Sequence, residues 1–415
     1  MHHDICVLGL GYIGLPTASI FATRGKKVLG VDVIPSVVDT INRGEIHIKE
    51  PELDILVRAA VHSGNLRASL KPEMAQTFVV AVPTPFKVTQ ANPKAPDLEY
   101  VESATRSIAS VVASGNLIIL ESTSPVGTTE LMREWLLDEL ARVRPGDLVE
   151  LSDSLMFAHC PERILPGQML KELVANDRIA GGLTPGAAEA ARDLYRTFCV
   201  GEIFVTDART AEMCKLTENA SRDVGIAFAN ELSLICDRLG VDVWKLISLA
   251  NRHPRVKILQ PGPGVGGHCI AVDPWFIVDA APDVARLIRT AREVNDGKPH
   301  YVVDQIKTSA EQFRSPIIAC LGLAFKADVD DLRESPAMEI VGRLVNEKIG
   351  RVIVVEPHIS EVPLSLRGNV ELALIDVAVK LADIVVLLVN HQEFLNLNRQ
   401  NLEGKVVIDT RGVWS

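Results

Sequence analysis

One cysteine of this chain follows a stretch rich in glycine and proline, and an aspartate comes four residues after it. Residues 261–267 read PGPGVGG, and Cys269 and Asp273 complete the segment. Glycine has no Cβ atom, so such a backbone lets a substrate come close to the sulfur. A thiol placed in this way is a candidate nucleophile. A structural loop with a buried cysteine explains the segment equally well, because cysteine is among the most buried residue types.

Three polar side chains share a spacing that places them on one face of a helix. Lys215, Asn219 and Arg222 are separated by four and three residues, within a stretch from 212 to 239 that has helical periodicity and stops at Gly240. Such side chains are costly to bury without partners, so they indicate an anionic or polyhydroxylated ligand. The alternative is a face that water covers.

The loop before the cysteine segment is basic. Residues 251–255 read NRHPR and include His253 and Arg255. Basic side chains beside a glycine-rich segment suit a phosphate or a group of sugar hydroxyls. This pattern is short and is not specific by itself.

The N-terminal region has the pattern of a dinucleotide-binding turn. An apolar strand at residues 5–8 runs into Gly9, Gly11 and Gly14, and a helical stretch follows. Gly9 permits the tight turn, Gly11 lets the backbone approach a pyrophosphate, and Gly14 lets helix and strand pack closely. The unpaired N–H groups of the helix N-terminus would then face the phosphates. A glycine-rich turn that binds nothing is the alternative.

Asp32 indicates which dinucleotide would bind. It ends a second apolar run at residues 27–31, where a carboxylate can accept hydrogen bonds from the adenosine ribose. The carboxylate would repel a 2′-phosphate, and residues 33–35 supply no arginine to replace it. The sequence therefore favours NAD over NADP.

Two threonines follow further strand-like runs. Thr84 comes after residues 78–82, and Thr123 comes after residues 117–120. Ligands of an open parallel sheet lie at the carboxyl ends of its strands, so both threonines could contact cofactor or substrate. Both lie near prolines, where threonine also serves as a turn or capping residue.

The C-terminal region is predicted to be a second α/β unit. Strand-like runs alternate there with helical patterns, and none is followed by a GxGxxG turn. Lys326 and Arg411 lie just beyond strand ends, where a diphosphate could be held. The strand-like runs are residues 316–322, 351–356, 384–389 and 406–409.

Composition restricts the class of protein. A chain of 415 residues is expected to form two or three domains, and its net charge of -10 argues against a nucleic-acid binder. Seven cysteines without paired spacing suggest reduced thiols and a cytoplasmic location. We find no signal peptide and no apolar run near the roughly 18 residues that span a bilayer, so we expect no membrane association.

Six segments, in order along almost the whole chain, resemble the UDP-sugar 6-dehydrogenase family. They are residues 9–14, 161–167, 210–219, 251–255, 261–275 and 321–336. The resemblance implies an α/β fold of two Rossmann-like doubly wound parallel-sheet domains joined by a central long-helix region. It also implies a homodimer that oxidises the C6 hydroxyl of a UDP-sugar to a carboxylate. Two NAD molecules would accept the four electrons, and no metal would take part. The expected domains are 1–203 for NAD, 204–300 for the helical, dimerisation and catalytic-loop region, and 301–415 for the UDP-sugar.

The resemblance also assigns roles to individual residues. Cys269 matches the nucleophile, which would form a thiohemiacetal and then a thioester. We expect Asp273, through a water, or Lys215 to remove the hydroxyl proton, and Glu162 or Asp273 to serve as base for hydrolysis. The polar set around the reacting carbon is matched by Lys215, Asn219 and Asp273. The cofactor contacts are matched, besides the three glycines, by Tyr12, Ile13, Asp32, Thr84, Thr123 and Arg333. The substrate pocket is matched by Arg163, Ile164, Lys215, Asn219, Arg222, His253, Arg255, Gly266, Lys326 and Arg411.

The sugar is indicated by one departure from the family pattern. Glucose-oxidising members carry a second glutamate shortly after the Pro161–Glu162 pair, where this chain has Pro166. This favours an N-acetylated amino sugar, UDP-N-acetyl-D-mannosamine, whose uronate would serve surface polysaccharide synthesis. UDP-N-acetylglucosamine and UDP-glucose remain as alternatives.

Two other classes of protein were considered. A two-electron dehydrogenase on a β-hydroxyacid scaffold would use Lys215 and Asn219 alone, and a non-enzymatic NAD-responsive binding protein would need neither. The Cys269 loop and the second α/β unit argue against both.

Overall fold

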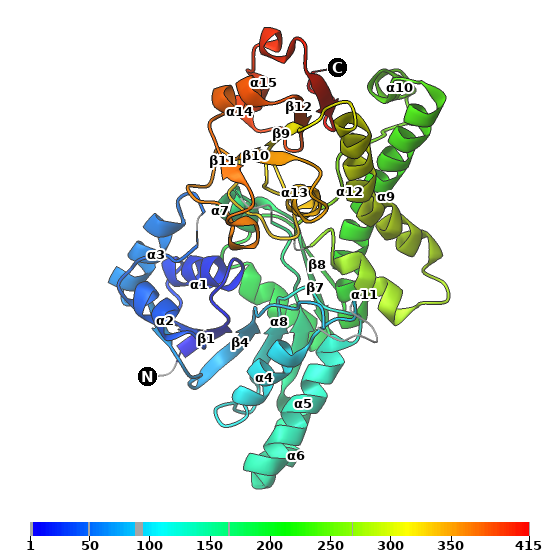
Figure 1. The fold of residues 1–415 in the computed structure, drawn as a ribbon. Coiled ribbons are helices and arrows are strands. Elements are labelled where there is room, and N and C mark those ends of the chain that lie inside the picture. Colours follow the sequence, from blue (N-terminus) through cyan, green and yellow to red (C-terminus); the bar gives the residue numbers. More distant parts are fainter. Residues whose placement is uncertain (1–2, 49, 88–93, 165–166, 268, 415) are drawn as a thin grey trace. The chain divides into compact units, whose positions relative to one another are not determined.

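The chain divides into two units, residues 1–217 and 218–415, and each is built around its own β-sheet (Figure 1). The computed structural model describes residues 3–48, 50–87, 94–164, 167–267 and 269–414. Strands and helices alternate in both units, which confirms the α/β class that the sequence predicts. The three-part division at residues 203 and 300 stays a prediction.

The first unit holds an eight-stranded sheet in the order β3-β2-β1-β4-β5-β6-β7-β8. Neighbouring strands are parallel except β6 and β7, which pair antiparallel. The chain begins at β1, adds β2 and β3 on one side, and then adds β4 on the other side of β1. This reversal is the switch point at which open α/β sheets bind ligands. The strands are β1 (His3–Leu8), β2 (Val28–Val31), β3 (Leu66–Ser69), β4 (Ala75–Val80), β5 (Leu117–Leu120), β6 (Met156–His159), β7 (Arg178–Gly182) and β8 (Ile203–Asp207).

Two apolar cores lie on the opposite faces of this sheet. Ile5 and Val7 of β1 belong to one core, and Cys6 and Leu8 belong to the other. Successive side chains of a strand point to opposite faces, and helices cover both, so the central strands are apolar throughout. The helices are α1 (Gly14–Thr23), α2 (Pro35–Asn42), α3 (Leu53–His62), α4 (Glu99–Ser107), α5 (Thr128–Val143), α6 (Leu148–Ser154), α7 (Met169–Ala175) and α8 (Pro185–Tyr195), with a 3-10 turn at Pro145–Asp147.

Helix α9 (Ala208–Leu239) is 32 residues long and contains the boundary between the units. It begins directly after Asp207, whose Oδ1 accepts a 2.9 Å hydrogen bond from the N–H of Thr210. It ends, as predicted, at Gly240, which has a φ of +65°.

The second unit holds a parallel sheet in the order β11-β10-β9-β12-β13. All four predicted strand-like runs of this region form strands, and the short β11 was not predicted. The strands are β9 (Ile317–Leu321), β10 (Arg351–Val355), β11 (Glu371–Leu372), β12 (Ile384–Leu387) and β13 (Val406–Asp409). The helices are α10 (Val243–Ala250), α11 (Asp273–Ala280), α12 (Arg286–Ala310), α13 (Pro336–Asn346), α14 (Ile375–Leu381) and α15 (Gln392–Leu395), with 3-10 turns at Leu364–Leu366 and Arg399–Leu402. None of the helices in the described ranges is both long enough and apolar enough to span a membrane.

Candidate active site

The turn after β1 has the geometry that a dinucleotide needs. Gly9 has a φ of +91°, and a Cβ atom there would lie 2.6 Å from the carbonyl oxygen of Ala81. A Cβ atom at Gly14 would collide with the carbonyl oxygen of Gly9, whereas one at Gly11 would meet no atom within 4 Å. Gly9 and Gly14 are therefore required by packing, and Gly11 leaves an open surface for a pyrophosphate at the start of α1.

Asp32 fixes the shape of the same turn. Its Oδ2 accepts a 3.1 Å hydrogen bond from the N–H of Leu10, and its Oδ1 accepts one of 3.0 Å from the N–H of Ile34. A carboxylate oxygen can accept more than one hydrogen bond, so capacity remains for a ribose hydroxyl. Tyr12 and Ile13 lie in the turn between β1 and α1, and their contacts with the cofactor stay predictions. These residues fit NAD.

The two threonines expected at strand ends lie next to each other. Oγ1 of Thr84 donates a 2.6 Å hydrogen bond to the carbonyl oxygen of Thr123. Thr84 follows β4 and Thr123 follows β5, and both are half-buried at the carboxyl edge of the sheet. This edge is where an open α/β sheet holds its ligand.

Glu162 belongs to a buried ionic cluster. Its Oε2 accepts a 2.6 Å hydrogen bond from Nη2 of Arg178, and its Oε1 accepts one of 2.7 Å from the N–H of Arg163. Glu121 lies 4.0 Å from Arg178 and accepts a 2.9 Å hydrogen bond from the hydroxyl of Tyr195. Burial, together with the charge of Glu162, raises the pKa of Glu121 to about 8, although Arg178 opposes this shift. Each oxygen of Glu162 thus accepts one hydrogen bond, and the role of Glu162 as a base stays a prediction.

The neighbouring predicted residues have local partners. Nη1 of Arg163 donates a 3.1 Å hydrogen bond to the carbonyl oxygen of Asp177, and Ile164 packs against the apolar core of the first unit. Pro166 lies outside the described residues. Substrate contacts at Arg163 and Ile164 therefore stay predictions.

Lys215 lies near a buried histidine of the first unit. His159 ends β6 and is 0% exposed. Burial lowers the pKa of His159 to about 3, and the positive charge of Lys215 adds to this shift. His159 is therefore neutral, and Lys215 is the nearby cation.

Asp273 and Asn219 are joined directly. Nδ2 of Asn219, on α9, donates a 2.5 Å hydrogen bond to Oδ2 of Asp273, the first residue of α11. Asp273 is 3% exposed, and its N–H donates a 2.8 Å hydrogen bond to the carbonyl oxygen of Cys269. The predicted polar pair thus adjoins the cysteine in the second unit.

Cys269 differs in exposure from the other cysteines. All seven lie in described parts of the chain, and Cys269 is the exposed one. Burial raises the pKa of Cys6 and of Cys320 to about 12, which makes these thiols unreactive. Of the two interpretations of this loop, the exposure of Cys269 favours a nucleophile over a buried structural cysteine.

The glycines before Cys269 have a packing role that the sequence did not reveal. A Cβ atom at Gly266 would lie 2.5 Å from the carbonyl oxygen of Glu334, and one at Gly267, where φ is +87°, would lie 3.0 Å from the ring of Phe325. The loop therefore lies flat against residues 323–336. This segment contains Lys326, which the sequence predicts to bind substrate.

The start of the glycine loop is held by a chain of buried polar side chains. The N–H of Gly262 donates a 2.8 Å hydrogen bond to Asn230 on α9, which donates one of 2.8 Å to Asn295 on α12. Asn295 donates one of 2.7 Å to Asp223, which also accepts one of 2.6 Å from Arg292. The sequence analysis missed these contacts, and their signal is the helical spacing of Asp223 and Asn230 on α9 and of Arg292 and Asn295 on α12.

Arg411 adjoins the same loop. Its Nε donates a 3.0 Å hydrogen bond to the carbonyl oxygen of Leu388, and its Nη1 lies 2.8 Å from where a Cβ atom of Gly262 would be. Burial lowers the pKa of Arg411 to about 10, although Asp409 opposes this shift. Arg411 remains a cation at neutral pH.

The other predicted ligand residues are exposed. Arg222 lies on α9, and Nδ1 of His253 accepts a 3.3 Å hydrogen bond from the N–H of Arg255. Arg333 forms a two-pronged ion pair with Asp331, with distances of 2.8 and 2.6 Å. Their contacts with substrate or cofactor stay predictions.

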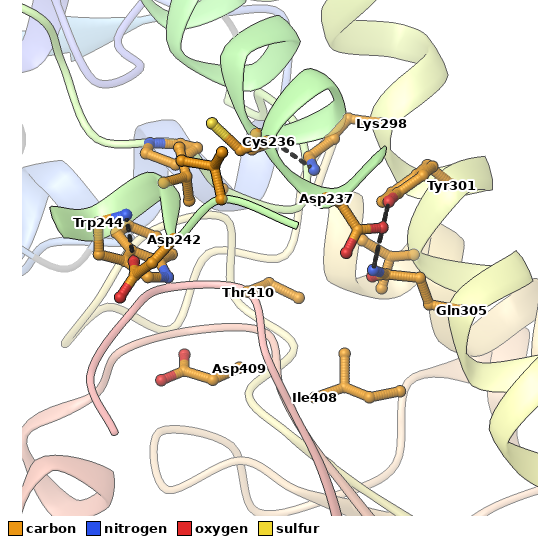
Figure 2. A pocket seen from close by; sticks show the side chains of 16 residues that line it. Cys236, Asp237, Asp242, Trp244, Lys298, Tyr301, Gln305, Ile408, Asp409 and Thr410 are labelled. Carbon is orange, nitrogen blue, oxygen red and sulfur yellow. Dashed lines mark hydrogen bonds between the residues drawn. The ribbon is translucent and has the colours of Figure 1, made fainter. Parts of the chain in front are cut away.

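A cavity of about 300 Å³ in the second unit borders the start of the glycine loop at Pro261 and Gly262 (Figure 2). Nζ of Lys298 donates a 2.7 Å hydrogen bond to Ser233, and burial lowers the pKa of Lys298 to about 8. The remaining lining residues are Cys236, Asp237, Val241, Asp242, Val243, Trp244, Tyr301, Val302, Gln305, Ile408, Asp409 and Thr410. Three carboxylates line this cavity, so it suits a neutral group better than an anion.

Comparison with known proteins identifies the family of the chain. Residues 3–199, 209–297 and 319–415 match the NAD binding, central and UDP binding domains of the UDP-glucose/GDP-mannose dehydrogenase family. The chain is 62% identical to an NDP-N-acetyl-D-galactosaminuronic acid dehydrogenase of Ralstonia nicotianae, over 99% of this chain and 96% of the relative. It is 57% identical to a UDP-N-acetyl-D-mannosamine dehydrogenase of Campylobacter jejuni, over 95% and 97%. A solved UDP-N-acetyl-mannosamine dehydrogenase of S. aureus is 43% identical, with a TM-score of 0.86 over 99% and 95%.

Proposed function

Because this chain belongs to the UDP-glucose/GDP-mannose dehydrogenase family and carries its NAD binding domain, we propose that it oxidises UDP-N-acetyl-D-mannosamine to the uronate. The names of several relatives that are 54–57% identical support this sugar. The observation that carries the chemistry is the exposed Cys269 in a glycine loop beside the Asn219–Asp273 pair. We further propose that the product serves surface polysaccharide synthesis.

The turn after β1 and Asp32 would hold NAD, which would supply a hydride acceptor for C6 of the sugar, one molecule for each of the two oxidations. Thr84 and Thr123 line the carboxyl edge of the sheet next to this turn and would orient it. Asp32 would select NAD over NADP, because its carboxylate repels a 2′-phosphate.

The residues of the chain handle protons and the carbon–sulfur bond. Asp273 accepts the proton of the C6 hydroxyl as the alcohol becomes an aldehyde, and it releases this proton to solvent before it acts as a base again. The thiolate of Cys269 then adds to the aldehyde carbon, and the oxyanion of this thiohemiacetal is stabilised by Lys215 and Asn219. Loss of the second hydride gives a thioester. A water molecule adds to the thioester, its proton passes to a base, and the thiolate leaves as the carboxylate forms.

Asp273 is the base that we retain for hydrolysis. Glu162, whose oxygens accept hydrogen bonds from Arg178 and from the N–H of Arg163, is the alternative. The carboxylate of Asp273 accepts a hydrogen bond from the amide of Asn219, and its N–H donates one to the carbonyl oxygen of Cys269.

The nucleotide part of the substrate is assigned to the second unit. We assign the diphosphate to Lys326 and Arg411, which follow β9 and β13. The neutral uridine suits the cavity that borders Gly262, because a charged diphosphate would face its three carboxylates. Replacement of Trp244 by alanine should weaken the binding of uridine, measured by calorimetry, and unchanged affinity would contradict this placement.

We also propose a homodimer that uses α9. Phe228, Ile235 and Leu239 are 52%, 46% and 69% exposed and share one face of the helix. A continuous apolar face of this kind is typical of an interface. The mass in solution of a Phe228→Asp variant tests this proposal: it should fall to that of a monomer, and a mass equal to the wild type would contradict it.

The second candidate substrate has the configuration of galactosamine, which the name of the 62% identical relative favours. Assays of NADH formation with UDP-N-acetylmannosamine, UDP-N-acetylgalactosamine, UDP-N-acetylglucosamine and UDP-glucose separate the candidates. We expect the highest kcat/KM with UDP-N-acetylmannosamine. A higher kcat/KM with any other sugar of the panel overturns the assignment.

A further inference from the structure

A buried glutamate organises the loop that follows β9. Glu356 follows β10 and is 4% exposed. Its Oε2 accepts hydrogen bonds of 2.7 and 3.0 Å from the N–H groups of Leu323 and Ala324. The same oxygen lies 3.0 Å from Nε2 of His391, and Oε1 accepts one of 3.1 Å from the N–H of His358. Every one of these contacts favours the carboxylate form.

The hydrogen bonds of His391 define its protonation state. The side chain is 0% exposed, and its Nδ1 accepts a 2.9 Å hydrogen bond from the N–H of Asp328. Because a backbone N–H can only donate, Nδ1 carries no proton, and Nε2 must donate to Glu356. Although burial opposes the shift, this hydrogen bond and those of the backbone N–H groups lower the pKa of Glu356.

The two anchors lie on either side of Lys326. Glu356 holds the chain at Leu323 and Ala324, and His391 holds it at Asp328, where φ is +60°. Such a φ is unfavourable for a residue with a Cβ atom, so the conformation of Asp328 depends on these bonds. The exposed Lys326 thus projects from a short arch with both ends fixed to one buried pair.

The same arch supports the loop of the nucleophile. Phe325, next to Lys326, lies against Gly266 and Gly267 in the glycine loop before Cys269. A shift of the arch would therefore move both the predicted diphosphate ligand and the surface on which the Cys269 loop rests.

A metal site is the other interpretation of this region. One ligand atom each from Asp328, His358 and His391 lie within 4.8 Å of one another. However, Nδ1 of His391 accepts the N–H of Asp328, and its Nε2 donates to Glu356. Neither nitrogen of His391 has a lone pair left for an ion, so the geometry favours hydrogen bonding over metal ligation.

We propose that the Glu356–His391 pair holds the arch of residues 323–328 in the conformation in which Lys326 binds the diphosphate. The inference rests on the proposed function, because it assumes that Lys326 binds the nucleotide. Neither Glu356 nor His391 touches substrate. Both act through the backbone that carries the lysine.

The test uses two replacements of His391 that each keep one half of its hydrogen bonding. The carbonyl oxygen of Asn lies close to the position of Nδ1, so His391→Asn retains the acceptor for Asp328. The amide nitrogen of Gln lies close to the position of Nε2, so His391→Gln retains the donor to Glu356 and loses the anchor at Asp328. The probe is UDP, whose dissociation constant is measured by calorimetry, with thermal unfolding to confirm that each variant is folded.

We expect His391→Gln to weaken the binding of UDP by about tenfold, the effect of losing one hydrogen bond of ~1.4 kcal/mol. His391→Asn should bind UDP within about threefold of the wild type, and the KM for NAD should change in neither variant. In a Lys326→Ala background, His391→Gln should have no further effect on UDP, because the two residues act as one unit. If His391 had only a general structural role, His391→Gln would weaken the binding of UDP by the same factor in the wild-type and the Lys326→Ala backgrounds.

The outcomes separate the two proposals. If Lys326→Ala weakens the binding of UDP but His391→Gln does not, the positioning role is wrong and the role of Lys326 stands. Additive effects in the double variant also overturn the positioning role. If Lys326→Ala leaves the affinity for UDP unchanged, the assignment of Lys326 and the inference fall together.

Discussion

Nδ2 of Asn219 donates a 2.5 Å hydrogen bond to Oδ2 of Asp273, and this contact joins the long helix α9 to the first turn of α11. An anionic side chain in the first turn of a helix is stabilised by the N–H groups there. Asn219 adds a directed donor, and the N–H of Asp273 binds the carbonyl oxygen of Cys269. The N–H groups of the helix, the amide of Asn219 and the hydrogen bond to Cys269 therefore hold the carboxylate of Asp273 beside the cysteine.

The first prediction concerns Asp273 as a base. Asp273→Asn keeps the size and the contact with Asn219 but removes the basic carboxylate, so kcat should fall by roughly 10²–10⁴-fold. The KM for NAD should not change. Asp279→Asn, an exposed position on the same helix, is the control and should retain full activity. Steady-state assays check this, and a kcat of Asp273→Asn within about threefold of the wild type would exclude the proposed role.

Asp32 should determine the choice of cofactor. In Asp32→Ala, the N–H groups of Leu10 and Ile34 lose their acceptor and the ribose loses its partner, so kcat/KM with NAD should fall by about tenfold or more. The activity with NADP should rise relative to that with NAD. Asp39→Ala removes an exposed carboxylate of α2 and should change neither value. An unchanged NAD to NADP ratio in Asp32→Ala contradicts the ribose contact.

The packing of the glycine loop gives a third prediction. In Gly266→Ala, the new Cβ atom would lie 2.5 Å from the carbonyl oxygen of Glu334, so the loop must move. We expect a loss of about 1–3 kcal/mol in the free energy of unfolding and a higher KM for the UDP-sugar. Gly342→Ala is the matched control, because a Cβ atom in this helix meets nothing within 4 Å and alanine favours helix. Equal thermal stability of both variants would show that Gly266 does not need to be glycine.

The raised pKa of Glu121 makes a prediction about pH. Glu121 titrates near 8 when folded, against 4.5 for its ordinary value, so between these pH values the folded chain binds the extra proton. The free energy of unfolding should therefore decrease as pH rises from 5 to 8, by at most about 1.4 kcal/mol per pH unit from this group. Glu121→Gln cannot lose a proton and should remove this part of the slope.

Urea unfolding at several pH values measures the effect. The control is Glu130→Gln, because the ion pair with Arg209 lowers the pKa of Glu130 and leaves it charged throughout this range. The control should keep the slope of the wild type. If Glu121→Gln keeps it too, the carboxyl of Glu121 is already charged at pH 5.

Local patterns in the sequence predicted much of the fold. The apolar runs that end at Gly9 and Asp32 form strands, and the spacing of Lys215 and Asn219 predicted the long helix α9. These features depend on neighbours in sequence, which periodicity and turn glycines report. The strands β3, β6, β7, β8 and β11 were not predicted, because each contains polar residues and their pairing depends on the order of the sheet.

The polar contacts that position the site could not be predicted. Glu356 and His391 are 35 residues apart, and they meet only because β10 and β12 lie on either side of β9. The pairing of Glu162 with Arg178 likewise requires the folded sheet, and the sequence analysis considered Glu162 as a base. For Gly266 the sequence indicated open space for a substrate, whereas the structure shows close backbone packing.

The most direct test of the account is the yield of NADH and of uronate from UDP-N-acetylmannosamine with Cys269→Ala beside the wild type. The wild type should form two NADH for each sugar oxidised, because Cys269 keeps the aldehyde bound as a thiohemiacetal for the second oxidation. Cys269→Ala should still allow the first hydride transfer but form the uronate at least about 10³-fold more slowly. Formation of uronate by Cys269→Ala at the rate of the wild type would contradict the account.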